Sequence, residues 1–325
     1  MGPIDRRAFL AAATAAASCA PAGAARAADY PARPIRFVVP FTPGAGTDRT
    51  ARLLAQHLTP MLGKPVVVEN RGGASGTIGT DLVAKAAPDG YTWLLGHDPP
   101  LTINQHFRQM PYAITDFAPV SLLTRVPLVL VARAGLPVTS LEDLVKMARE
   151  APGKLTISNS GNGSSGHLAA ALFLFVTKTE MLHVPYKGQA EAIADVLGGR
   201  IDLNFTAIPN ILSHARAGKL KVIANASPAR FPGLPDVPTI SEAGYPGFDA
   251  SAFHALLMPR GTPTAVIEKV NADVDAVLAM PEVTGTLGSL GLTPVGGKPE
   301  RLAELLKADS ERWGQLIRDA GITAD

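Results

Sequence analysis

Apolar residues follow two patterns along the chain: short continuous runs, which predict buried strands, and longer stretches with apolar positions three or four apart, which predict helices. The first run, residues 35–40, passes through a turn-rich loop into the helical pattern of residues 47–62. The apolar face of this predicted helix consists of Ala51, Leu54, Leu58 and Met61. Gly63 ends it. The segment therefore predicts a strand, a glycine loop and a helix.

The same alternation continues, with strands predicted at residues 65–69 and 91–96 and a helix at residues 78–86 between them. Alternating strands and helices are typical of a parallel sheet with right-handed crossovers. Ligands bind such sheets at the carboxyl ends of the strands. We therefore expect residues 42–48, 72–77 and 97–102 to meet at one rim.

Two further apolar runs, residues 117–126 and 128–132, are separated by Pro127, where we place a crossing into a second domain. Ser140 begins a helix as its N-cap. Strands are then predicted at residues 155–158, 183–185, 201–205 and 221–226, and helices at residues 168–176, 190–197 and 208–217.

After a Pro/Gly-rich surface connection, residues 253–258 predict a strand that returns to the first domain, followed by helices at residues 263–280 and 299–320. The sequence thus predicts an α/β protein of two domains joined by two hinge crossings. Residues 28–127 and 251–325 form domain 1, and residues 128–250 form domain 2. A double crossing of this kind makes a hinge.

The N-terminal segment has the features of an export signal. Arg6 and Arg7 precede a weakly apolar, alanine-rich run, and residues 25–27 form an A-x-A cleavage site. The arginine pair resembles a twin-arginine signal, although the motif is imperfect and Sec export stays open. We expect residues 1–27 to be removed near Ala27 and the mature protein to be periplasmic. The only cysteine, Cys19, lies inside this segment in a poor lipoprotein box.

Removal of the signal takes three arginines and one aspartate from the 30 basic and 28 acidic residues, which leaves 27 of each. The mature chain is then formally neutral and has no clustered basic face, so we expect no nucleic-acid partner. Without cysteine it forms neither disulfides nor thiolate metal sites. We expect a monomer that binds no metal and no cofactor.

Two loops carry the candidate chemistry. Free N–H groups at the start of the predicted helix near Thr47 and Asp48, each a possible N-cap, favour an anion. Residues 159–167 repeat the design, with Gly161, Gly163 and Gly166 in a weak dinucleotide pattern that lacks the acidic residue at the end of the next strand. We prefer a carboxylate held by backbone N–H groups and the hydroxyls of the serines in this loop, Ser160, Ser164 and Ser165. Plain strand-to-helix turns are the alternative.

Rival chemistries have weaker support. The sequence contains no Gly-x-Ser-x-Gly elbow, and a serine next to His167 in the sequence is not a triad. His97 and Asp98 invite a metal interpretation, but no carboxylate cluster accompanies them, so both are expected at the rim. Tyr186 either stacks on a ligand or packs. Arg49, Arg71 and Lys187 either pair with an acidic ligand or remain solvated.

Seven runs in order cover nearly the whole mature chain: YPARPIRFVVPFTPGAGTD, VVVENRGGASGTIG, VAKAAPDGYTWLLG, MPYAITDFAPVSLL, HVPYKG, LPDVPTISEAGYPGF and ERWGQLIRDAGI. Together they resemble the solute receptors of tripartite tricarboxylate transporters, the Bug family. The resemblance implies a fold like that of type II periplasmic binding proteins. It also implies a non-enzymatic receptor that binds a small organic acid between two domains and delivers it to a membrane permease. A sensor subunit with a signalling partner and a serine hydrolase are the alternatives.

Carried over from the family, the ligand-binding loops comprise Phe41, Thr42, Gly44, Ala45, Gly46, Thr47 and Asp48 in domain 1 and Ser160 to His167 in domain 2. Gly76, His97, Tyr186 and Thr206 complete the expected site. Ala45 replaces a glycine that is usual in the family, and Thr206 stands where many members have an acidic residue. Because such an acid would favour a ligand amino group, we hypothesise a plain carboxylate without one.

Overall fold

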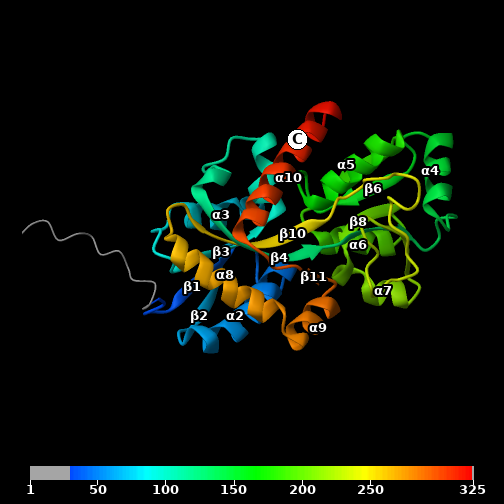
Figure 1. The fold of residues 1–325 in the computed structure, drawn as a ribbon. Helices are drawn as coiled ribbons and strands as arrows, with labels where there is room; N and C mark the ends of the chain where they lie inside the picture. The colour runs from blue at the N-terminus through cyan, green and yellow to red at the C-terminus, as the bar shows by residue number, and fades with distance from the viewer. Residues whose placement is uncertain (1–29, 324–325) are drawn as a thin grey trace, which may run out of the picture.

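The computed structural model describes residues 30–323 as two α/β domains, each built on a mixed sheet with helices on its faces (Figure 1). The export signal predicted at residues 1–27 lies outside the described residues. The first sheet has six strands in the order β11-β4-β10-β3-β1-β2. Its strands are β1 (Ile35–Val39), β2 (Val66–Asn70), β3 (Thr92–His97), β4 (Phe117–Val126), β10 (Ala252–Pro259) and β11 (Thr293–Pro294).

Strands β1, β2 and β3 are parallel, as the alternating pattern predicts, and every residue of β10 is buried. β10 lies antiparallel between β3 and β4, which makes the sheet mixed rather than parallel. The carboxyl ends of β1 and β3 therefore lie at the same rim as the first residues of β10. This rim faces the second domain.

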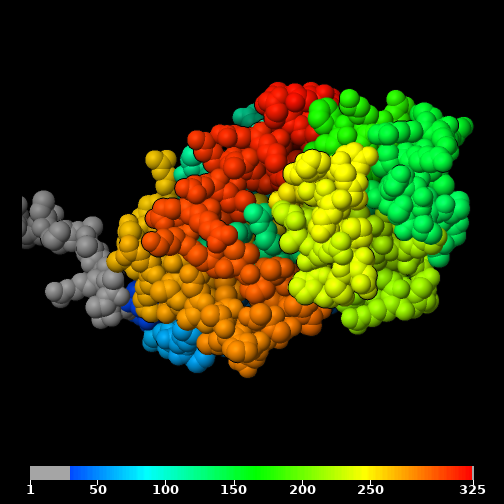
Figure 2. Space-filling model, turned by 45° about the vertical axis from the view of Figure 1, so that its right-hand side comes forward, coloured from blue at the N-terminus to red at the C-terminus, as the bar shows by residue number. Residues whose placement is uncertain are grey.

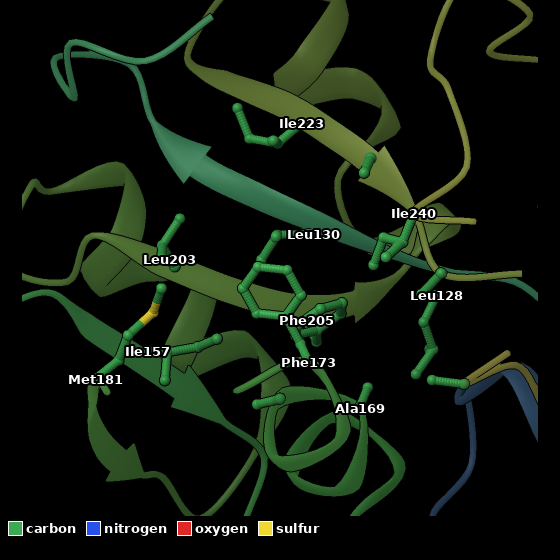
Figure 3. Packing of buried hydrophobic residues seen from close by; sticks show 14 of the residues in the cluster. Leu128, Leu130, Ile157, Ala169, Phe173, Met181, Leu203, Phe205, Ile223 and Ile240 are labelled. Carbon is green, nitrogen blue, oxygen red and sulfur yellow. The ribbon is translucent and has the colours of Figure 1, made fainter. Parts of the chain in front are cut away.

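The second sheet has five strands in the order β7-β6-β8-β5-β9. They are β5 (Leu128–Arg133), β6 (Thr156–Asn159), β7 (Leu182–Pro185), β8 (Leu203–Ala207) and β9 (Leu220–Asn225). Figure 3 shows its apolar core, where Phe205 of β8 faces Phe173. Their ring centroids lie 5.9 Å apart in an edge-to-face arrangement, which aromatic pairs prefer.

Helices cover both sheets. In the first domain they are α2 (Gly46–Leu62), α3 (Thr77–Ala84), α8 (Thr264–Leu278), α9 (Pro281–Ser289) and α10 (Pro299–Asp319). In the second they are α4 (Leu141–Glu150), α5 (Ser165–Thr177), α6 (Gln189–Leu197) and α7 (Leu212–Arg216). Short turns of helix are η2 (Ala74–Gly76), η3 (Pro99–Ile103), η4 (Asn104–His106), η5 (Ile114–Asp116) and η6 (Ile208–Asn210). None of the helices between residues 30 and 323 is long and apolar enough to cross a membrane.

The chain crosses between the domains at Pro127, which separates β4 from β5, and again in the surface connection from β9 to β10, yellow in Figure 2. Helix α10 makes a further link. Leu302 and Leu306 pack in a cluster of the first domain, whereas Trp313 and Ile317 pack in the core of the second. Figure 2 shows the C-terminal end of α10, in red, lying against the green second domain. Trp313 and Ile317, which the sequence assigned to domain 1, therefore pack in the core of domain 2.

Three local predictions are wrong. The N-cap of α2 is Ala45 rather than Asp48 or Thr47, because Asp48 lies in the first turn and reaches back to the loop. Met61 is 41% exposed, and Leu62 takes the buried position in the last turn of α2. The helix predicted at residues 208–217 is split into η6 and α7. In contrast, Ser140 caps α4 and Gly63 ends α2 in the left-handed region, as predicted.

Candidate functional site

A cavity of about 650 Å³ lies between the two domains, at the rim where the parallel strands of both sheets end. The structure places eleven of the predicted site residues on its wall: Phe41, Thr42, Gly44, Ala45, Gly46, Thr47, His97, Ser160, Ser164, Ser165 and Thr206. Its volume is typical of small-molecule sites. The two loops singled out in the sequence therefore face the same space.

The first loop is tied down by Asp48, the third residue of α2. Its carboxylate accepts a hydrogen bond from the backbone N–H of Gly44 at 2.9 Å and others from Arg52 and Asn70. Burial opposes the charge of Asp48, but these donors outweigh burial and hold its pKa below the ordinary value. Asp48 does not line the cavity and instead fixes the loop that does.

His167 has the same role in the second loop, at the equivalent third position of α5. Its Nδ1 accepts a hydrogen bond from the backbone N–H of Gly163 at 3.1 Å, four residues earlier, as Asp48 accepts from Gly44. Burial, helped by His183, lowers the pKa of His167 to about 4, which keeps Nδ1 an acceptor at neutral pH. In both loops, the side chain at the third position of the helix thus accepts a hydrogen bond from the backbone N–H four residues earlier. The acceptor is a carboxylate in one domain and a neutral imidazole in the other.

With Asp48 and His167 bonded to the loops in this way, the first N–H groups of α2 and α5 have no side-chain partners. Ala45, the N-cap of α2, has no side chain that could accept the N–H groups of the first turn. In α5, the hydroxyl of Ser164 caps only the N–H of His167. The hydroxyl of Thr47, a 5% exposed residue on the cavity wall, has no hydrogen-bond partner among residues 30–323. These groups suit an acceptor brought in by a ligand.

Four other predicted residues do not line the cavity. Gly76 packs under the Phe41 ring, since an added Cβ would lie 3.1 Å from Cζ of that ring. Gly161 and Gly163 adopt positive φ and shape the second loop. The hydroxyl of Tyr186 donates to Asp195 at 2.7 Å, which raises the pKa of Tyr186 to about 12. The Tyr186 hydroxyl is therefore committed to its own domain.

Two imidazoles form the floor of the cavity on the first sheet. His97 ends β3, and its register partner on β10 is His254, with ring centroids 5.5 Å apart. Nδ1 of His254 lies 3.2 Å from the hydroxyl of Thr50 and 3.1 Å from that of Thr124. Burial holds the pKa of His254 well below its ordinary value, so this ring is neutral. Nδ1 of His97 lies 2.5 Å from Oδ1 of Asp98, but the angles between the two groups do not meet those of a hydrogen bond.

The charge on the wall is one-sided. Arg49 and Lys187 both line the cavity, from α2 and from the loop after β7, while none of the described residues that line it is acidic. Arg71, the third candidate cation, is paired with Glu69 away from the cavity. The cavity therefore presents positive groups and N–H donors without a competing carboxylate, which favours an anion.

The rest of the wall includes four residues from segments that the sequence placed at the rim or in the second loop: Ser75, Pro99, Asn162 and Gly166. The sequence did not point to the others, because they come from distant segments. They are Val126, Leu128, Gly188, Gln189, Phe205, Ala207, Pro209, Asn210, Ala252, His254, Leu290 and Leu292. The sequence signal that could have found them is their position, since several follow a predicted strand or flank Pro127. Leu290 and Leu292 follow α9, a helix that the pattern did not predict.

Serine and histidine are not arranged for acyl transfer here. The Ser164 hydroxyl accepts the backbone N–H of His167, and Nδ1 of His167 accepts that of Gly163. Each group is used to hold the loop. Among residues 30–323, no group of three or more His, Cys, Asp or Glu side chains is placed to hold a metal ion.

Two α/β domains, linked by two crossings and enclosing a ligand-sized cavity at the strand ends, define the class of two-domain solute-binding proteins. The chain belongs to the tripartite tricarboxylate transporter family of receptors, whose profile matches residues 50–322. Protein BugT of Bordetella pertussis is 39% identical over 90% of both chains. The resemblance to the Bug family and the expected fold class are confirmed.

Two solved structures resemble this chain over nearly its whole described length. The Rpa4515 protein of R. palustris, solved with adipate, is 38% identical with a TM-score of 0.82, covering 91% of this chain and 99% of that one. MatC of Rhodopseudomonas palustris, with bound malate, is 34% identical with a TM-score of 0.76, covering 89% and 100%. Both ligands named for these relatives are carboxylates.

Proposed function

We propose that this protein is an extracytoplasmic receptor that binds a small organic carboxylate between its two domains. The observation that carries the proposal is the interdomain cavity, onto which two helix N-termini open and whose described lining includes two cations and no acidic side chain. Helix N-termini and unpaired N–H groups stabilise an anion through their aligned dipoles. The unpartnered Thr47 hydroxyl supplies a further donor at the same wall.

The same lining argues against an amino acid as ligand. A ligand ammonium group needs a carboxylate or several acceptors when it leaves water. Thr206 lies on the wall, and its hydroxyl is held by Asn210 at 3.1 Å. With no acid on the described wall, we expect a carboxylate without an amino group.

The partner and location follow from the family and the N-terminus. We infer export through the signal at residues 1–27, cleavage near Ala27, and delivery of the ligand as a monomer to a membrane permease. The family description names receptors of tripartite transporters, and BugD, a structural relative, is a periplasmic binding protein. A receptor needs no reacting group, which agrees with the use of Ser164 and His167 to hold the loop.

A substitution at Gly46 tests the site. Gly46 lies on the wall in the first turn of α2, and nothing lies within 4 Å of an added Cβ, so Gly46→Leu places a side chain in the cavity without a steric clash in the fold. Gly285→Leu, in α9, is the matched control because it also adds Leu in open space but lies outside the cavity. Both variants are to be screened by thermal shift against mono-, di- and tricarboxylates.

We expect at least one carboxylate to stabilise the wild type and the Gly285→Leu control, and to leave Gly46→Leu unchanged. At one hundred times its dissociation constant, a ligand adds about 2.7 kcal/mol of stability. Equal stabilisation of both variants would contradict the site. Gly163→Val is a poorer probe, because its φ of +75° strains a branched residue and an added Cβ would lie 3.2 Å from Asn104 of the other domain.

A further inference from the structure

The chemistry of the cavity changes from one end to the other. The strands of the first sheet lie in the order β1, β3, β10, β4, β11. The wall residues that they carry follow this order, from the loop at Gly44 after β1, through His97 of β3 and His254 of β10, to Val126 of β4. Leu292, next to β11, ends this series. The wall therefore passes from N–H donors to imidazole rings and then to aliphatic side chains.

The second domain shows the same order. Ser160 and Lys187, from the loops after β6 and β7, and Ser165, the first residue of α5, line the cavity at the edge of the sheet remote from the crossing. Leu128, the first residue of β5, and Ala207, at the end of β8, line it next to the crossing. The two polar residues that line it beside them, Thr206 and Asn210, are hydrogen-bonded to each other. The polar end is thus formed by loops of both domains, and the apolar end lies at the hinge.

The apolar end is closed by contact between the domains. A Cβ added to Gly291 would lie 2.9 Å from Cδ of Pro209, so the segment that carries Leu290 and Leu292 touches the start of η6. Both wall cations are carried by the segments that form the polar end, Arg49 by the first turn of α2 and Lys187 by the loop after β7. Arg125, the residue before Val126, does not line the cavity. A second carboxylate placed at the hinge end would therefore have no cation of the described wall beside it, and an unpaired charge in an apolar environment is costly.

The two ends are far enough apart for an extended ligand. Three strand spacings separate β1 from β4, which corresponds to roughly 14 Å at about 4.8 Å per spacing. We propose that the ligand is an amphiphilic monocarboxylate, whose carboxylate lies at the two loops and whose alkyl or aryl body extends to Val126, Leu290 and Leu292. This inference rests on the proposed function and names the class of acid.

The preference for a monocarboxylate can be tested by titration calorimetry of the mature protein with matched pairs of acids. Hexanoate and adipate differ only in the distal group, as do 4-methylbenzoate and terephthalate. We expect the monocarboxylate of each pair to bind at least about tenfold more tightly, because the distal charge of the other would be desolvated without a partner. From butanoate to hexanoate, affinity should rise about fourfold per buried methylene.

A charge at the apolar end should reverse the preference. Leu290→Lys offers the missing cation, so adipate should gain relative to hexanoate, whereas Leu290→Met should keep the wild-type order. Leu182→Lys, at a 58% exposed leucine of β7 outside the cavity, is the control and should also keep it. Adipate binding as tightly as hexanoate in the wild type would overturn this inference and leave the proposed function intact. Failure of all these acids and of the wider carboxylate screen to bind would overturn both.

Discussion

The imidazole of His167 makes the second binding loop sensitive to acid. Its Nδ1 accepts the N–H of Gly163 only while the ring is neutral, and a protonated ring would present a second donor to that N–H. The residue is 6% exposed, and burial together with His183 lowers its pKa from 6.5 to about 4. The unfolded chain therefore takes up this proton at higher pH than the folded protein does.

The consequence is a loss of stability over a defined range of pH. Stability from His167 is complete above pH 6.5 and falls as the pH drops towards 4, because the unfolded state binds the additional proton in this window. The shift of the pKa corresponds to about 3 kcal/mol. The pKa values of His183 and His254 are lowered as well, so the wild type should lose more than this amount in total.

His167→Asn isolates the contribution of His167. Asparagine places Oδ1 where the imidazole has Nδ1, which keeps an acceptor for Gly163 but removes the titration. Urea unfolding of both proteins at pH 7.5, 6.5, 5.5, 4.5 and 4.0 should show the variant less stable at neutral pH, because the buried ring is lost. The gap should narrow by about 3 kcal/mol as the pH falls to 4.

Leu174→Ala on the same helix is the control, because it destabilises α5 without removing a titratable group. Its unfolding free energy should run parallel to that of the wild type across the series. If the His167→Asn curve is also parallel to the wild type, His167 does not hold the loop as a neutral acceptor.

Other substitutions test the supports of the site. Asp48→Ala should lower the free energy of unfolding by about 3 kcal/mol in urea at pH 7, because it leaves the N–H of Gly44 and two side-chain donors without their charged acceptor; Asp48→Asn should cost less. Gly79→Ala should cost about 1–3 kcal/mol, since the added Cβ would lie 2.6 Å from a backbone oxygen, whereas Gly285→Ala in open space should not destabilise. Trp313→Ala should cost about 3–5 kcal/mol in calorimetry, and a smaller loss would mean that α10 does not support the second core.

The sequence predicted the elements whose signal is local. Apolar runs located the strands of both sheets except β11, and Pro127 located the crossing between the two sheets. The helix α9 was missed because Gly285 and Gly288 weaken its helical propensity and its buried face has only Val283 and Leu287. Packing against the first sheet decides its structure. The position of β10 between β3 and β4 likewise depends on pairing across more than a hundred residues.

The candidate site was predictable to the extent that it consists of loops. Both glycine loops were located from strand-loop-helix patterns, and they face one cavity. The supporting roles of Asp48 and His167 were not predicted, because a side chain that bonds to a backbone N–H four residues earlier leaves no motif. The aliphatic end was missed for another reason. Val126, Leu290 and Leu292 are ordinary core residues in the sequence, and only the fold assembles them at the hinge.

A crystal structure of the mature protein with a bound carboxylate would show whether both loops bind the same anion. We expect the carboxylate oxygens within hydrogen-bond distance of N–H groups in the first turns of both α2 and α5, with the Thr47 hydroxyl now paired. A ligand bound elsewhere, with both first turns facing only solvent, would contradict this expectation.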